Sequence, residues 1–119
     1  MSKKHKPLGS PAEFFAALDH LAQTVDARSG SDPTESYTAK LLSKGPAKCA
    51  KKLGEEAVEL ALAIASEGDD EVASEAADLL YHLTVALRSR GIALDDVAAA
   101  LAARQGTSGL AEKAARKPD

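Results

Sequence analysis

Two pairs of carboxylates lie within the most apolar stretches of this chain, and they constrain how it folds. Glu56 and Glu59 are three residues apart, so they share one face if their segment is helical. Glu75 and Asp78 repeat that spacing further along. Between the pairs, residues 67–70 read Glu-Gly-Asp-Asp, which is typical of a turn. An antiparallel helical hairpin would therefore bring four carboxylates together.

Four adjacent carboxylates repel one another unless a cation neutralises them. Because all the ligand atoms would be oxygens, the pattern favours a hard metal ion, Mg²⁺ or Mn²⁺. The alternative is a pair of solvated acidic faces. That alternative fits either pair alone, but it fits both pairs poorly because each is surrounded by apolar residues that predict burial.

Helical periodicity runs through most of the chain and predicts an all-α fold. We expect helices over about 11–27, 33–43, 47–66, 70–90 and 94–104, and no strand. Ser10 and Asp32 are each followed by Pro and, three residues on, by Glu, which is a helix-start pattern, and Asp69 or Asp70 is expected to cap the fourth helix. The predicted inward residues of the first, third and fifth helices include Phe14, Leu18, Leu21, Val25, Leu53, Leu60, Ile64, Leu94, Val97 and Leu101. The apolar surface of the third helix is widened by Val58, Leu62 and Ala65. We therefore expect this helix to be covered on more than one side.

Composition limits the size of the core. The chain has 119 residues, enough for one domain, and 45% are hydrophobic, but many of these are alanine and only 3% are aromatic. We therefore expect a four- to five-helix bundle that is completed by forming a homodimer. The predicted boundaries are a flexible tail over 1–9, a domain over 10–104, and a C-terminal tail over 105–119 that is either disordered or ordered against a partner.

Charge and apolar patterning exclude several classes of protein. The net charge of -3 argues against general nucleic-acid binding. No apolar run approaches the length of a membrane span, and the basic start lacks the apolar stretch of a signal peptide. The single Cys49 rules out an internal disulfide and fits a reducing compartment. The sequence thus predicts a soluble cytoplasmic protein.

Lysines are dense just before the acids. Lys48, Lys51 and Lys52 lie early in the predicted third helix, where cations oppose the helix dipole and where Lys before Glu is the weaker orientation for a pair. A bound polyphosphate would explain them, and a solvated basic face explains them equally well. His82, one turn after Asp78, is interpreted as a hydrogen-bonded core residue, with orientation of a metal ligand as the alternative.

Four segments together resemble a known family. They are SYTAKLL at 36–42, KGP at 44–46, KLGEEAVE at 52–59 and EAADLLYHL at 75–83. The ExxE and ExxD motifs within them are similar to those of the all-α nucleotide pyrophosphohydrolases, the MazG-like superfamily. The wider set resembles its phosphoribosyl-ATP pyrophosphohydrolases of histidine biosynthesis, from about Phe14 to Arg104.

The resemblance implies a Mg²⁺-dependent, homodimeric hydrolase. It would cleave the α–β phosphoanhydride of phosphoribosyl-ATP, giving phosphoribosyl-AMP and pyrophosphate. Matching the motifs implies metal ligation by Glu56, Glu59, Glu75 and Asp78, with Glu55 as the adjacent acid that either supports a ligand or acts as a base. A cyclohydrolase domain with cysteine ligands is fused to some relatives, and with one Cys this chain is expected to be the stand-alone form.

Two other functions stay open at this point. One is a house-cleaning pyrophosphatase of the same superfamily, acting on noncanonical nucleoside triphosphates. The other is a helical metal-binding or interaction module without catalysis. For the enzyme, we hypothesise that Lys48, Lys51 or Lys52 stabilises the charge on the departing pyrophosphate.

Overall fold

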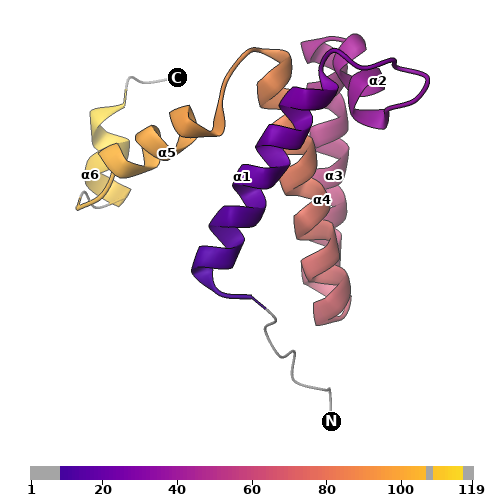
Figure 1. Cartoon of the computed structure of the whole chain (residues 1–119). Helices are drawn as coiled ribbons and strands as arrows, with labels where there is room; N and C mark the ends of the chain where they lie inside the picture. The colour runs from indigo at the N-terminus through magenta and orange to yellow at the C-terminus, as the bar shows by residue number, and fades with distance from the viewer. Residues whose placement is uncertain (1–8, 107–108, 117–119) are drawn as a thin grey trace.

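The computed structural model describes residues 9–106 and 109–116, and within these ranges the fold is all helical, as predicted. Its centre is an antiparallel hairpin of α3 (Pro46–Ser66) and α4 (Asp69–Ser89), joined at Glu67 and Gly68. Helix α1 (Pro11–Arg28) lies against α4, and α2 (Tyr37–Ser43) packs at one end of the hairpin (Figure 1). This arrangement places α2, α3 and α4 around one end of the molecule.

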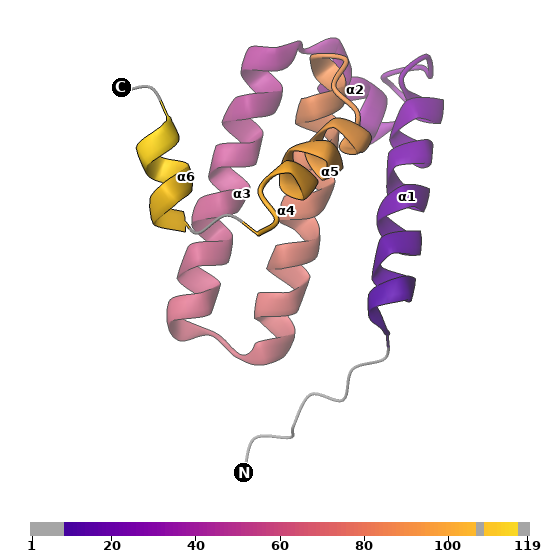
Figure 2. The ribbon, with the colours of Figure 1, turned by 90° about the vertical axis from the view of Figure 1, so that its left-hand side faces the viewer.

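Two short helices follow the hairpin. Helix α5 (Leu94–Ala103) and helix α6 (Gly109–Ala115) lead away from α3 and α4 in Figure 1, whereas in the 90° view α5 crosses in front of α4 and α6 is drawn to the left of α3 (Figure 2). Helix α6 lies in the segment expected to be a tail. No helix in the part of the chain that the structure describes is long and apolar enough to cross a membrane.

The first residues of the helices can be compared with the starts that the sequence predicts. Ser10 caps α1 as predicted, since its Oγ accepts a hydrogen bond from the Glu13 amide at 3.2 Å. The predicted start at Asp32 is wrong. Asp32 Oδ1 instead accepts hydrogen bonds from the Thr34 amide and hydroxyl, which forms a local turn, and α2 begins at Tyr37 with Ser36 as its cap. Asp32 and Ser36 are both possible cap residues, four positions apart, and Asp32 forms the turn that precedes the helix.

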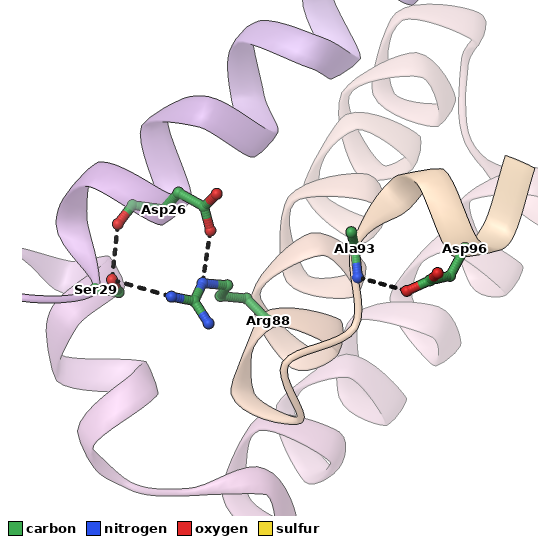
Figure 3. A network of polar contacts seen from close by, with 5 residues as sticks. All are labelled: Asp26, Ser29, Arg88, Ala93 and Asp96. Carbon is green, nitrogen blue, oxygen red and sulfur yellow. Dashed lines mark hydrogen bonds and ion pairs between the residues drawn. The ribbon is translucent and has the colours of Figure 1, made fainter.

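The start of α4 also differs from the prediction. Gly68 occupies the cap position with no side-chain cap, and Asp69 and Asp70 lie inside the first turn. Their carboxylates are favourable there because the helix dipole is positive at that end. At α5, Ala93 cannot cap through its side chain. Its backbone N–H instead donates to Asp96 Oδ2 at 3.1 Å (Figure 3).

A polar contact joins the end of α1 to the end of α4. Arg88 Nε lies 2.6 Å from Asp26 Oδ1, and the same guanidinium reaches Ser29 Oγ at 3.5 Å (Figure 3). Both partners of the ion pair are well exposed to solvent, so its net stabilisation is at most about 1 kcal/mol. The pair therefore joins α1 to α4 but adds little to the stability of the fold.

The core is as small as the composition implied. Its fully buried apolar residues are Val25, Ala39, Leu41, Cys49, Ala63 and Val85. Several residues predicted to face inward do not: Phe14, Ile64 and Leu101 are 50%, 64% and 60% exposed. The expected cover on α3 is also missing from the isolated chain, since Val58 and Leu62 are 60% and 59% exposed. Periodicity identified apolar positions correctly, but one chain lacks the surface to cover them all.

Candidate active site

Three carboxylates meet where α3 packs on α4. One oxygen from each of Glu56, Glu75 and Asp78 lies within 4.8 Å of the others. Glu56 is a buried residue on the face of α3 that turns toward α4, whereas Glu75 is half-buried and Asp78 is exposed. The predicted hairpin thus brings three of the four motif acids together, and we call these three residues the acidic cluster.

Glu59, the fourth motif acid, lies beside the acidic cluster and contacts it through Glu56. Its pKa is raised, first by a hydrogen bond to the Glu56 side chain and then by the negative charges of Glu56 and Glu75. Two carboxyl groups share such a bond only when one holds a proton. A cation bound beside these side chains would relieve the same repulsion between carboxylates.

The cluster fits a hard divalent cation. Glu75 Oε2 is buried and has no hydrogen-bond partner, which is an unfavourable state for a carboxylate oxygen. Burial raises the pKa of Glu75, and the charges of Asp78, Glu56 and Glu67 raise it further. Because a Mg²⁺-like ion takes carboxylate oxygens as ligands, it would satisfy this atom and remove the repulsion together. The acidic cluster therefore offers a site for a metal ion.

His82 and Lys52 flank Glu56 from the two helices. His82 Nε2 lies 3.6 Å from Glu56 Oε1, and Lys52 Nζ lies 3.5 Å from the same oxygen. His82 is buried, and burial lowers its pKa, so the imidazole is neutral at neutral pH. The sequence favoured a core role for His82. The structure confirms that His82 is buried and places its Nε2 next to Glu56.

The other predicted site residues lie further from the cluster. Glu55 is exposed, and its position is rotated by about 100° around the axis of α3 from that of Glu56. Lys48 and Lys51 are also exposed, and within the described ranges neither makes an ion pair. Of the three candidate lysines, only Lys52 contacts the acidic cluster. The pKa of Lys52 is raised, first by the Tyr37 phenol and then by Glu56, so it stays charged at neutral pH.

Aromatic side chains complete the site, and the sequence did not single them out. Tyr37 stacks on Tyr81 with ring centroids 6.4 Å apart and planes 17° apart, and its edge meets His82 at 6.4 Å. Thr38 Oγ1 is hydrogen-bonded to the Tyr81 hydroxyl at 2.5 Å. The partners of Tyr37 and Thr38 lie on α4, and Tyr81 is 43 residues after Thr38, so no local signal could reveal these contacts.

The raised pKa values predict how stability depends on pH. Glu59 and Glu75 bind more protons in the folded state than in the unfolded state once the pH exceeds their ordinary value of 4.5. The free energy of unfolding of the metal-free protein should therefore fall as the pH rises from 4.5 through the raised values. Excess Mg²⁺ should reverse that loss at neutral pH.

Urea unfolding in EDTA and in Mg²⁺, at pH values on either side of 4.5, measures the effect. The control is Glu75→Gln, which removes the buried unpaired oxygen's charge and should reduce both the pH slope and the gain with Mg²⁺. Equal slopes for wild type and Glu75→Gln would show that the cluster carries no repulsion.

Comparisons with known proteins agree with this geometry. The family described as "Phosphoribosyl-ATP pyrophosphohydrolase" matches residues 18–105, which include the whole acidic cluster. A phosphoribosyl-ATP pyrophosphatase of Caulobacter sp. (strain K31) is 58% identical over 105 residues, covering 88% of this chain and 97% of that protein. One from Cereibacter sphaeroides (strain KD131 / KCTC 12085) is 61% identical over 103 residues, covering 86% and 99%.

Proposed function

The chain belongs to the phosphoribosyl-ATP pyrophosphohydrolase family, and we propose that it hydrolyses the α–β phosphoanhydride of phosphoribosyl-ATP at the acidic cluster. The products are phosphoribosyl-AMP and pyrophosphate, and the reaction is a step of histidine biosynthesis. The observation that carries the proposal is the meeting of Glu56, Glu75 and Asp78 within 4.8 Å, inside the segment that the family matches.

Glu56, Glu75 and Asp78 would hold Mg²⁺, with Mn²⁺ as a chemically similar substitute and Glu59 adjacent. When bound, such an ion neutralises phosphate charge and lowers the pKa of a coordinated water. The fit rests on the buried, unpartnered Oε2 of Glu75. Three of the four motif acids are thus proposed to keep the metal roles that the sequence predicted, and Glu59 is given a different role.

We propose that Glu59 accepts a proton from the attacking water. Its side chain is exposed and lies next to Glu56 at the edge of the acidic cluster, where a water bound to the cluster would be within reach of it. Glu55, the alternative base, is exposed, and its position is rotated by about 100° around α3 from that of Glu56. A Glu59→Gln variant that keeps the wild-type rate, beside a Glu55→Gln variant that loses it, would reverse this assignment.

Lys52 is the lysine that we expect to meet the phosphates. Its ammonium lies 3.5 Å from Glu56 and stays charged, so it can pair with the pyrophosphate as negative charge develops on it. We expect Lys52→Met to lower kcat by about a hundredfold, in the range seen when one donor to a developing charge is removed. Lys48→Met and Lys51→Met change exposed lysines nearby that make no contact with the acidic cluster. The kcat of each should therefore stay within about threefold of wild type in the same steady-state assay. A larger loss in either control than in Lys52→Met would move the role.

A second copy of the chain is the proposed cover for α3. The side of α3 away from α4 carries exposed small and apolar residues over its whole length: Ala50, Gly54, Ala57, Val58, Ala61, Leu62, Ile64 and Ala65. Monomeric proteins rarely leave so continuous an apolar strip in water. Because the buried core of one chain is small, the homodimer that the sequence predicted would add the missing apolar burial.

Pyrophosphate release is the test of the proposed reaction. The purified protein is supplied with phosphoribosyl-ATP, and in parallel with ordinary and modified nucleoside triphosphates, each with Mg²⁺ or with EDTA. Release from phosphoribosyl-ATP that stops on chelation is expected. Release mainly from the triphosphates would indicate a house-cleaning enzyme with the same site. Release from none of them, with metal-dependent stability retained, would indicate a binding module.

A further inference from the structure

A hollow lies at the start of α2 and is connected to the acidic cluster through the side chains of Tyr37 and His82. Its volume is about 430 Å³, and it is lined by Pro33, Thr34, Glu35, Ser36, Tyr37 and Lys40. Tyr37 links the two places, because its ring borders the hollow and also meets His82, whose Nε2 lies 3.6 Å from Glu56. A ligand anchored at the cluster can therefore extend across Tyr37 into the hollow.

Only some of the lining groups are available to a ligand. Ser36 Oγ accepts the cap hydrogen bond from the Ala39 amide, and the Thr34 hydroxyl donates to Asp32. By contrast, Glu35 and Lys40 are exposed and make no ion pair among the described residues. The hollow thus presents one aromatic ring, one carboxylate and one ammonium group.

This set of groups suits a nucleoside with a sugar phosphate attached. An aromatic ring that is half exposed offers a face for stacking a base. A carboxylate disfavours a bare polyphosphate, but it accepts hydrogen bonds from ribose hydroxyls. An ammonium group pairs with a single phosphate as a point charge. A polyphosphate belongs instead at the acidic cluster with its cation.

Tyr37 is held firmly enough to act as a platform. Its ring is supported by the stacked ring of Tyr81, and the Tyr81 hydroxyl is in turn hydrogen-bonded to Thr38 at 2.5 Å. Side chains of α4 therefore back one side of the Tyr37 ring, while 54% of the residue stays exposed to a ligand. Stacking on a ring that is supported on one side costs less entropy than stacking on an unsupported one.

We propose that this hollow binds the phosphoribosyl-adenine end of the substrate, with Tyr37 stacking the adenine, Glu35 accepting the ribose hydroxyls and Lys40 pairing with the 5-phosphate. The inference rests on the proposed function and deepens it. Ordinary nucleoside triphosphates lack the added phosphoribosyl group and leave Lys40 without a ligand. The hollow thereby selects the substrate of this family over the triphosphates that related hydrolases use.

Product binding in EDTA tests the hollow apart from metal and turnover. Phosphoribosyl-AMP and AMP are titrated into the full chain by calorimetry. Wild type should bind phosphoribosyl-AMP more tightly than AMP. Lys40→Met should weaken phosphoribosyl-AMP about tenfold and leave AMP unchanged, since only the former carries the second phosphate. Tyr37→Leu should weaken both by about tenfold, because both carry the base.

The control is Lys44→Met, which removes an exposed charge at the end of α2 outside the hollow and should change neither affinity. A wild type that binds both ligands equally, or a Lys40→Met variant that loses both equally, would overturn the inference. Wild-type turnover of phosphoribosyl-ATP is measured on the same samples. If wild-type turnover is normal and the variants bind both ligands as wild type does, the role assigned to the hollow is wrong and the proposed function stands. If the wild type shows no turnover, the proposed function and the role of the hollow are both wrong.

Discussion

Glu56→Gln is expected to lower the rate of pyrophosphate release from phosphoribosyl-ATP by about a thousandfold or more. Glu56 is the one cluster acid that is buried, at 8% exposed, and it contacts both Lys52 and His82. An amide supplies neither the charge nor the second ligand oxygen. Losing several kcal/mol of charge stabilisation at a phosphoanhydride corresponds to a rate loss of that size. Steady-state assays at saturating Mg²⁺ measure it.

The matched control changes the neighbouring acid. Glu55→Gln removes the same charge from the same helix one position earlier, where the side chain is exposed and away from the cluster, and it should stay within about threefold of wild type. Helix content by circular dichroism should be equal in both variants. If Glu55→Gln is inactive and Glu56→Gln is active, the catalytic acid has been assigned to the wrong side of α3.

The acids show how much of the site the sequence contained. Their three-residue spacing within apolar helices, separated by a turn at Gly68, was sufficient to predict the hairpin and the meeting of Glu56 with Glu75 and Asp78. Spacing could not show that Glu59 would lie beside the group formed by Glu56, Glu75 and Asp78 and not within it. That difference depends on how far the two helices rotate against each other, which side-chain packing decides.

The contacts of α2 were beyond the reach of local patterns. The sequence showed Tyr37 and Thr38 beside a turn, but their role depends on Tyr81, which is 43 residues after Thr38. The misplaced start of α2 has the same cause on a smaller scale. Asp32 and Ser36 are both residue types that can cap a helix. Asp32 accepts a hydrogen bond from the Thr34 amide and forms a turn, whereas Ser36 accepts one from the Ala39 amide and caps α2.

Leu62→Glu is expected to separate the proposed dimer. Leu62 is 59% exposed in the single chain, near the middle of the apolar strip on α3. In a twofold interface each residue lies close to the same strip of its partner, so the substitution would bury two like charges. At several kcal/mol for buried unpaired charge, the dissociation constant should rise by about a thousandfold or more. The mass in solution should fall from twice 12.3 kDa to 12.3 kDa.

Leu101→Glu gives the matched control, because Leu101 on α5 is 60% exposed and lies outside the strip. Both substitutions place a charge on a similarly exposed leucine, so the single chain tolerates each to the same degree. Any additional loss of mass and thermal stability in Leu62→Glu must therefore come from contacts that the chain makes with its copy. A monomeric wild type, or equal dissociation in both variants, would contradict the α3 interface. The apolar strip would then require another occupant, because a core this small leaves it uncovered within one chain.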